Sequence, residues 1–232
     1  MKKVVILSAG PGLSEIVEKY GHSSDWIPNL LSAYNLEFIV EKTYLKDDLS
    51  INDGDLFIIT GSKYSVYDNN QWIKELLGFV SLLIKNKKPI LGICFGHQII
   101  AKCIGADVVK NKLGWELGSY KINLTDSGLK NPLFKGFNNN DFAYESHQDV
   151  VINLPKNATI LANTEKSVQS FNYDNCYGVQ FHPEFSLEVT RMLMDLRIQK
   201  GIKVDNNILE ESVNSYKILN NFIEIYGGEL NG

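Results

Sequence analysis

The chain has 232 residues, of which 44% are hydrophobic and 22% charged, the proportions of an ordinary globular protein rather than a disordered or fibrous one. Its 23 Lys and Arg residues and 27 Asp and Glu residues give a net charge of −4. Because no basic block is present, we expect no nucleic-acid partner.

The first hundred residues alternate short apolar runs with amphipathic stretches, which is typical of a parallel sheet with crossover helices. The run after Met1 is too short for a signal peptide, so it is expected to be the first strand. The predicted strands are 4–7, 37–40, 56–60 and 89–94. The predicted helices are 26–34 and 71–85, and a third helix begins just after Cys94.

Residues 106–181 are β-rich, with turns that contain Asn, Gly, Pro and Asp. The strands expected there are 108–109, 119–124, 142–146, 159–162, 168–171 and 176–181. Apolar residues recur at helical spacing from Leu187 and again over 208–225, which predicts two helices with a break at Gly201.

The sequence therefore predicts the α/β class, with an open, mostly parallel central sheet flanked by helices and an additional β-rich segment. Because no repeat or linker divides the chain, we expect residues 1–232 to form a single domain with a C-terminal helical extension from about 200. No apolar segment approaches the roughly 20 residues of a membrane span, so no membrane association is expected.

The segment around Cys94 carries the strongest chemical signal. Gly92, Cys94 and Gly96 are spaced two residues apart and lie between a buried-type strand and a helix. This is the nucleophile-elbow arrangement, with sulfur in place of a hydroxyl. At a helix N-terminus, Cys94 would be favoured as a thiolate, and the Phe95 amide could donate to an oxyanion. The alternative is that Cys94 is a core residue, since free cysteines are often buried.

The other two cysteines, Cys103 and Cys176, are interpreted as core residues. An odd, sparse set of cysteines does not suit a disulfide framework. We therefore expect free thiols in a reducing compartment and a cytoplasmic protein.

A thiolate nucleophile requires an imidazole, which in turn requires a carboxylate to fix its tautomer. His182 stands before Pro183, which favours extended backbone at the histidine. The two-residue spacing then places His182 and Glu184 on the same side of the chain. We interpret His182 as the general base and Glu184 as the carboxylate that orients its imidazole ring.

The other histidines have different expected roles. His97 is expected to pack within the elbow helix, His147 to lie in a polar turn over 144–149 that could line a pocket, and His22 to be exposed. No His or Cys pair has the spacing typical of a zinc site, so no metal is expected.

These motifs resemble those of the class I, or triad, glutamine amidotransferases. Residues 92–98 match the family's nucleophile motif and residues 181–184 match its His-Pro-Glu motif. The resemblance implies a flavodoxin-like α/β fold with Cys94 as nucleophile, His182 as acid and base, and Glu184 as its orienter. It implies no cofactor.

The resemblance also extends to the oxyanion hole and the substrate site. Gly61 and Ser62 lie in a segment similar to the oxyanion loop of GMP synthases, although Ser62 and Lys63 replace a glycine and a proline. Together with Phe95, Gly61 and Ser62 are expected to form the oxyanion hole. The implied substrate-binding residues are Gln98, Ser146, His147, Gln148 and Asp149.

The 114–118 and 146–149 segments look most like those of stand-alone members, which include bacterial amidotransferase-like proteins and plant γ-glutamyl peptidases. The motif of an ATP-pyrophosphatase half is missing, so the chain is not expected to be a complete GMP synthase. Any synthase partner would then be a separate chain.

The implied reaction is hydrolysis of the γ-amide of glutamine through a cysteinyl γ-glutamyl thioester, with ammonia delivered to an acceptor that the sequence does not name. One alternative is a γ-glutamyl peptidase that cleaves γ-glutamyl peptides, and another is a non-catalytic regulatory binding module. An α/β-hydrolase is disfavoured, because its carboxylate precedes the histidine whereas Glu184 follows His182.

Overall fold

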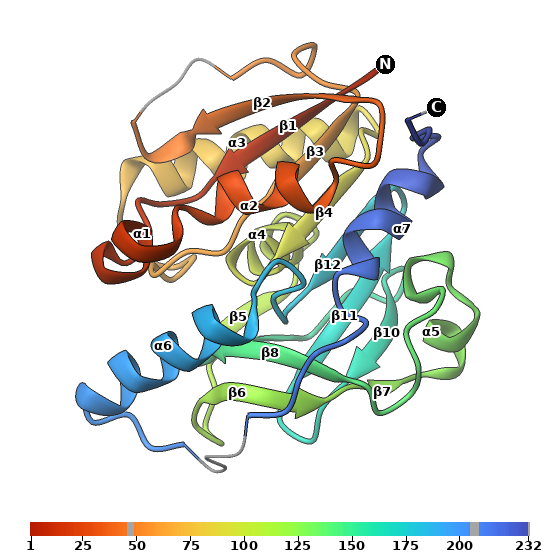
Figure 1. Ribbon diagram of the computed structural model, residues 1–232. Helices are drawn as coiled ribbons and strands as arrows, with labels where there is room; N and C mark the ends of the chain where they lie inside the picture. The colour runs from red at the N-terminus through yellow and green to blue at the C-terminus, as the bar shows by residue number, and fades with distance from the viewer. Residues whose placement is uncertain (46–48, 205–208, 232) are drawn as a thin grey trace.

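The computed structural model of the chain describes residues 1–45, 49–204 and 209–231, and Figure 1 shows how its elements are arranged. One large sheet runs through the centre with the strand order β2-β1-β3-β4-β12-β11-β10-β7. The pairs from β2 to β12 are parallel, and the pairs from β12 to β7 are antiparallel. The predicted α/β class with a mostly parallel central sheet is confirmed.

The parallel strands are β2 (Leu36–Lys42), β1 (Lys2–Ser8), β3 (Leu56–Ile59), β4 (Ile90–Ile93) and β12 (Cys176–Val179). The antiparallel strands are β11 (Val168–Tyr173), β10 (Thr159–Asn163) and β7 (Asn123–Leu124). Two separate ladders pair β5 (Asp107–Lys110) with β9 (Asp149–Ile152), and β6 (Glu116–Lys121) with β8 (Phe142–His147). The β-rich half thus extends the main sheet and adds both ladders.

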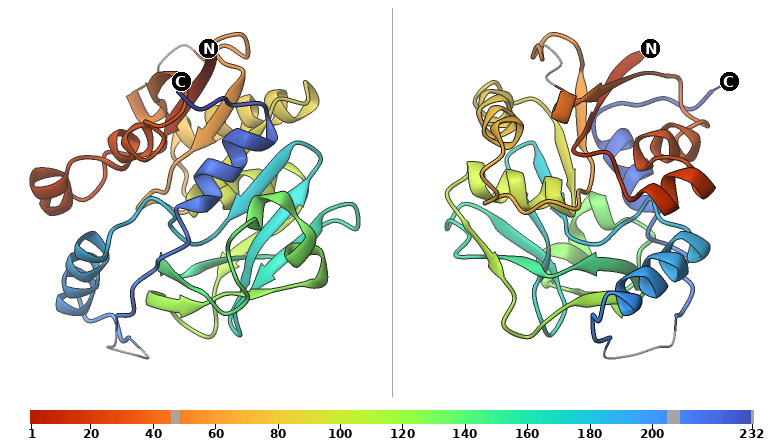
Figure 2. Two further views of the ribbon diagram at one scale, coloured as in Figure 1. Left: turned by 45° about the vertical axis from the view of Figure 1, so that its right-hand side comes forward. Right: turned by 90° about the vertical axis from the view of Figure 1, so that its left-hand side faces the viewer.

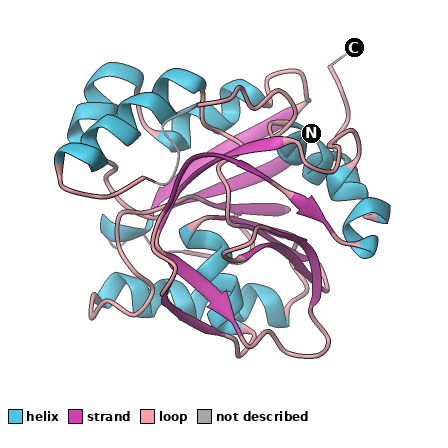
Figure 3. Cartoon of the chain, turned by 90° about the horizontal axis from the view of Figure 1, so that it is seen from below, coloured by secondary structure: helices cyan, strands magenta, loops and turns pink. Residues whose placement is uncertain are grey.

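Helices cover both faces of the main sheet (Figures 2 and 3). One face packs against α2 (Ser23–Leu30) and α7 (Lys217–Ile225), and the other against α3 (Gln71–Lys85) and α4 (Phe95–Cys103). The remaining helices are α1 (Ser14–Tyr20), α5 (Asp126–Lys130) and α6 (Leu187–Gln199), with short 3₁₀ turns η1 (Thr43–Leu45) and η2 (Pro132–Phe134).

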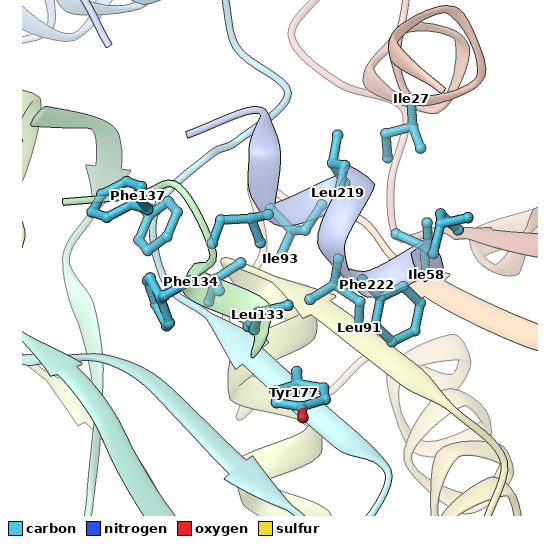
Figure 4. Packing of buried hydrophobic residues seen from close by; sticks show 14 of the residues in the cluster. Ile27, Ile58, Leu91, Ile93, Leu133, Phe134, Phe137, Tyr177, Leu219 and Phe222 are labelled. Carbon is cyan, nitrogen blue, oxygen red and sulfur yellow. The ribbon is translucent and has the colours of Figure 1, made fainter. Parts of the chain in front are cut away.

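The central strands are apolar on both sides because both faces are covered. In β1, Val4 faces the α7 side and Val5 faces the α3 side, as strand alternation requires. Figure 4 shows the α7 side, where Phe222 lies beside Leu91 and Leu219 belongs to the same buried cluster. Each fully buried side chain of this kind contributes about 1.5–3 kcal/mol. The packing fixes the strand ends from which the site is built.

Several predicted elements have different bounds in the structure. The predicted helix 26–34 is α2, which begins earlier, at Ser23, because His22 caps it: its Nδ1 accepts from the Ser24 amide at 3.2 Å. His22 Nε2 also donates to the Gly10 carbonyl oxygen at 2.9 Å, so this side chain is half-buried rather than freely exposed. The predicted strand 119–124 is divided into β6 and β7 at Ile122, whose side chain is fully buried.

Two other expectations are wrong over part of their length. The polar turn expected over 144–149 is mostly strand, since β8 continues to His147 in register with β6. The helix expected over 208–225 begins at Lys217, and Ile208 lies outside the described residues. Before Lys217 the chain follows β8 instead: Ser212 Oγ donates to the Phe142 carbonyl oxygen at 2.7 Å.

The turn between β4 and α4 leaves no room for side chains at its two glycines. A Cβ on Gly92 would lie 2.4 Å from the Gly96 backbone, and a Cβ on Gly96 would lie 2.5 Å from the Ile59 carbonyl oxygen. Since both obstacles are backbone atoms, neither can move without displacing a strand or the helix. The elbow glycines are therefore required by close packing.

Gly96→Ala is expected to lower the free energy of unfolding by about 1–3 kcal/mol, because the added methyl overpacks the contact with β3. The matched control is Gly78→Ala in α3, where the added Cβ meets no packed neighbour within 4 Å. There alanine should stabilise by about 0.5–1 kcal/mol through helix propensity. Urea denaturation of both variants measures the difference, and equal effects would contradict the packing argument.

Candidate active site

Cys94 lies in a strained turn at the end of β4. Its φ of 49° and ψ of −98° are unusual for a residue with a side chain, and α4 begins at the next residue. Its amide donates to the Val179 carbonyl oxygen of β12 at 2.8 Å, which anchors the turn between two parallel strands. The elbow predicted from the sequence is therefore present, with Cys94 at a helix N-terminus.

His182 follows β12 and faces Cys94. Its amide donates to the Tyr144 carbonyl oxygen at 2.8 Å, and its ring stacks on Phe185 with centroids 3.8 Å apart. Nδ1 donates to Glu184 Oε1 at 2.8 Å, and the ring lies close enough to the Cys94 side chain for the two groups to interact electrostatically. The predicted side-by-side placement of His182 and Glu184 is confirmed.

The charge state of His182 follows from these contacts. Burial alone would lower its pKa, but the negative charge of Glu184 and the interaction with Cys94 outweigh burial and raise the pKa to about 10. The ring is thus an imidazolium at neutral pH. A protonated imidazole beside a cysteine can stabilise a thiolate and later deliver its proton.

The residues expected to form the oxyanion hole surround the same pair. A Cβ on Gly61 would lie 2.8 Å from His182 Cε1 and 3.6 Å from Cys94 Cβ, so its backbone passes directly beside both side chains. Phe95 is the first residue of α4, where backbone amides have no partner within the helix. Ser62 lines the cavity above Cys94.

A cavity of about 240 Å³ opens over Cys94. It brings together residues that lie far apart in the sequence, from the loop after β3, the elbow helix and the start of β9. The predicted site residues that line it are Ser62, Cys94, Phe95, Gln98, Ser146, His147, Gln148 and Asp149.

Gln98 is held in place by two hydrogen bonds. Its Nε2 donates to the Asp149 carbonyl oxygen and to Gln180 Oε1, both at 3.1 Å. These bonds use the amide hydrogens and leave the side-chain oxygen as an acceptor in the cavity wall. This orientation suits recognition of a substrate ammonium group.

Asp149 binds the loop after β3 with its carboxylate. Ser65 Oγ donates to Oδ2 at 2.5 Å, and the Tyr67 hydroxyl donates to Oδ1 at 2.8 Å. Both carboxylate oxygens are therefore engaged by the loop that carries Gly61 and Ser62. We call this set of contacts the loop clasp.

His147 is buried in an ion cluster beneath the cavity. Strand register places Glu116 directly opposite His147, and Glu145 precedes it by two residues on the same face of β8. Nε2 lies 3.1 Å from Glu145 Oε2 and 3.3 Å from Glu116 Oε2, while Nδ1 donates to the Asp149 carbonyl oxygen at 3.1 Å. The imidazole therefore positions the Asp149 backbone that also holds Gln98.

The cluster shifts the pKa of each member. Burial would lower the pKa of His147, but the two carboxylates outweigh burial and hold the pKa well above its usual value. Burial raises the pKa of Glu145 to about 7. For Glu116, His147 and two hydroxyl groups outweigh burial and lower the pKa.

His97 behaves differently although it is also fully buried. It lies in α4 as predicted, with its ring centroid 4.9 Å from that of Phe171. Burial lowers its pKa to about 3, so the ring is neutral and acts as packing beneath the elbow.

Sequence reasoning did not assign roles to Glu116, Glu145, Ser65, Tyr67 or Arg197. Glu145 and His147 could have been paired from their i, i+2 spacing in a strand. The others became neighbours of the site only through strand register and loop packing, which no local pattern encodes.

No group of three or more His, Cys, Asp or Glu side chains is placed to hold a metal ion within residues 1–45, 49–204 and 209–231. In the same ranges, no helix has the length and apolar character needed to cross a membrane.

Comparison with protein families places this site in a known context. Residues 15–196 match the family model described as "Glutamine amidotransferase class-I". A glutamine amidotransferase-like protein of Schizosaccharomyces pombe is 34% identical over 221 residues, which cover 87% of this chain and 86% of the relative.

Two further relatives have more specific names. A glutamine-hydrolyzing GMP synthase subunit of Sulfurisphaera tokodaii is 36% identical over 163 residues, covering 69% of this chain and 78% of that protein. Gamma-glutamyl peptidase 4 of Arabidopsis thaliana is 28% identical over 220 residues, which cover 91% of this chain and 86% of that protein. The crystal structure of a glutamine amidotransferase from Thermotoga maritima has the same fold, with a TM-score of 0.77 and 22% identity. The match covers 97% of this chain and 98% of that chain.

Breaking the loop clasp should loosen the loop. Tyr67→Phe removes one hydrogen bond to Asp149, and a loss of about 1 kcal/mol corresponds to roughly fivefold faster amide exchange over residues 62–68. Hydrogen–deuterium exchange measures the exchange rate of these amides. The control is Tyr64→Phe on the same loop, whose ring packs edge-on against Trp72. Equal exchange in both variants would contradict the clasp.

The free energy of unfolding should fall as the pH rises above about 6.5. His147 and His182 have raised pKa values in the folded chain, so the stability they contribute is complete below the unfolded value of about 6.5 and is lost toward the folded values. Each histidine can contribute a slope of up to about −1.4 kcal/mol per pH unit. Urea titrations from pH 6 to 9 measure the slope, and stability that stays flat or rises would refute the buried imidazolium ions.

Proposed function

The chain belongs to the class-I glutamine amidotransferase family, and on that premise we propose that it hydrolyses the γ-amide of glutamine through a thioester on Cys94. The observation that carries the proposal is the contact of Cys94, in its strained turn, with the His182–Glu184 pair. A buried cysteine with a merely structural role would need neither the turn nor the charged imidazole.

The first half of the reaction forms the thioester. The Cys94 thiolate attacks the γ-carbonyl carbon, and the negative charge that develops on its oxygen is stabilised by amides of Phe95 and the Gly61–Ser62 loop. The C–N bond then breaks as His182 Nε2 gives its proton to the leaving nitrogen, and ammonia departs. Glu184 holds the ring so that Nε2 faces the reacting atoms.

The second half restores the enzyme. The now neutral His182 takes a proton from a water molecule, and the resulting hydroxide adds to the thioester carbonyl. The C–S bond breaks, glutamate is released, and thiolate and imidazolium are regenerated together. No cofactor takes part, and every proton is accounted for by His182 and water.

The substrate end of the site supports recognition of an amino acid. Gln98 presents a carbonyl oxygen to the cavity, and the 146–149 segment forms its wall. We assign the α-amino and carboxylate groups of glutamine to Gln98, Ser146 and Gln148. We propose that His147 and Asp149 are positioning residues. His147 holds the cavity wall at the Asp149 backbone, and the Asp149 carboxylate holds the oxyanion loop.

The fate of ammonia depends on a partner. One relative is a GMP synthase subunit described as glutamine-hydrolyzing, so we propose a separate synthase chain as acceptor. We place the reaction in the cytoplasm, because Cys94 is a free thiol and must stay reduced to react.

A second candidate reaction is the cleavage of γ-glutamyl peptides by the same residues. It is favoured by the space beside His182 and Glu184, where a leaving group larger than ammonia could lie. The γ-glutamyl peptidases among the relatives agree with this reaction.

Cys94→Ala should lower glutamine hydrolysis to background, while Cys103→Ala and Cys176→Ala should keep it. Burial raises the pKa of Cys103 to about 11 and that of Cys176 to about 12, so both remain thiols. Release of ammonia and glutamate measures turnover, and mass spectrometry after treatment with a glutamine-like diazo-ketone identifies the labelled cysteine. Activity in Cys94→Ala would overturn the mechanism, and an unlabelled, inactive wild type would favour a regulatory binding module.

A further inference from the structure

A second cavity borders the His182–Glu184 pair. It has a volume of about 100 Å³ and touches His182, Glu184 and Gly61. The two cavities share part of their walls, formed by Ser62, Lys63, Ser146 and Arg197. The two cavities are therefore adjacent, and Cys94 lines one while His182 lines the other.

The lining of the second cavity is mainly apolar and comes from elements outside the elbow. Ile16 contributes from α1 and Leu13 from the N-cap of that helix. Trp26 contributes from α2, Leu193 from α6, and Phe185 from the segment between His182 and α6. Ile16 packs against Leu193 and Trp26 packs edge-on against Phe185, with ring centroids 6.0 Å apart. These contacts make the cavity a fixed part of the fold.

We propose that this cavity is a leaving-group subsite for a γ-glutamyl amino acid with a short aliphatic side chain. The inference rests on the proposed function of Cys94 and His182. His182 must give its proton to the leaving nitrogen, so the leaving amine lies on the His182 side of the scissile bond. The group attached to that nitrogen then enters the cavity that His182 borders.

The volume sets the size of the side chain that fits. An apolar cavity of about 150 Å³ can hold a benzene molecule, and one water occupies about 30 Å³ of liquid. Ammonia, which is the size of water, would leave most of the subsite unfilled. A leucine or valine side chain is smaller than benzene and suits a cavity of about 100 Å³, whereas an indole is larger than benzene.

Charge at the shared wall explains why the leaving group is an amino acid rather than a simple amine. Lys63 and Arg197 line both cavities, and neither forms an ion pair anywhere in the described part of the chain. Arg197 Nε is buried without a hydrogen-bond partner, and its guanidinium lies 5.0 Å from the Trp115 ring centroid.

The position of the carboxylate follows from covalent geometry. In the leaving amino acid, only the α-carbon separates the carboxylate from the scissile nitrogen. The carboxylate must therefore stay at the wall between the cavities, where Lys63 and Arg197 lie. The α-carboxylate of the γ-glutamyl group is three methylene or methine carbons from the reacting carbonyl and lies deeper in the Cys94 cavity.

The first test compares four substrates with the wild-type protein: glutamine, γ-glutamyl-glycine, γ-glutamyl-leucine and γ-glutamyl-isoamylamide. Burying the leucine side chain should raise kcat/KM over γ-glutamyl-glycine by about tenfold to a hundredfold. The isoamylamide retains the aliphatic group without the carboxylate, so its kcat/KM should fall below that of γ-glutamyl-leucine. Equal values for the glycine and leucine substrates would overturn the subsite.

The second test changes the subsite itself. Leu13→Trp should fill it and reduce the ratio of kcat/KM for γ-glutamyl-leucine to that for glutamine by about tenfold or more. The matched control is Leu129→Trp, an exposed position on α5, which should leave the ratio unchanged. Leu13→Ala supplies an independent variant that enlarges the cavity and should shift the preference toward γ-glutamyl-phenylalanine.

The outcomes separate this inference from the proposed function. If glutamine is hydrolysed but the ratio is unchanged in both Leu13 variants, the subsite is refuted and the Cys94 chemistry stands. If the wild type hydrolyses neither glutamine nor any γ-glutamyl amide, the proposed function fails and the subsite fails with it.

Discussion

The left-handed turn at Cys94 is the constraint on which the rest of the site depends. It is possible only because Gly92 and Gly96 allow the α4 helix to approach β4 and β3 closely, while the Cys94 amide is tied to β12. The turn places Cys94 at the N-terminus of α4. Since β3, β4 and β12 are neighbouring parallel strands, their carboxyl ends bring Gly61, Cys94 and His182 together.

Around this turn, two buried polar assemblies hold the substrate wall. The His147 ion cluster fixes the Asp149 backbone, and that backbone in turn accepts from Gln98 on the elbow helix. The Asp149 carboxylate clasps the loop that passes over Cys94. The wall, the elbow helix and the oxyanion loop are thus connected through a single residue, so a disturbance of the cluster would reach each of them.

The elements that carry chemistry were predictable where a local rule determined them. The glycines around Cys94 indicate a tight strand-to-helix turn, and the His182-Pro183 sequence with Glu184 two residues on indicates a base and its orienter. The ion cluster was not predictable in full, because Glu116 meets His147 only through the register of β6 and β8. The expected turn at 144–149 failed for the same reason: its polar residues are typical of a turn, but β8 continues to His147 in register with β6, and His147 pairs with Glu145.

The central claim is that Cys94 carries a γ-glutamyl thioester during turnover. It is tested most directly by mixing the wild-type protein with glutamine, quenching in acid within the first turnovers, and measuring the mass of the Cys94 peptide. The account predicts a peptide heavier by one γ-glutamyl group, with the increase lost on treatment with hydroxylamine and with no change on the Cys103 and Cys176 peptides. An unmodified Cys94 peptide while glutamate accumulates, or the adduct on another residue, would contradict it.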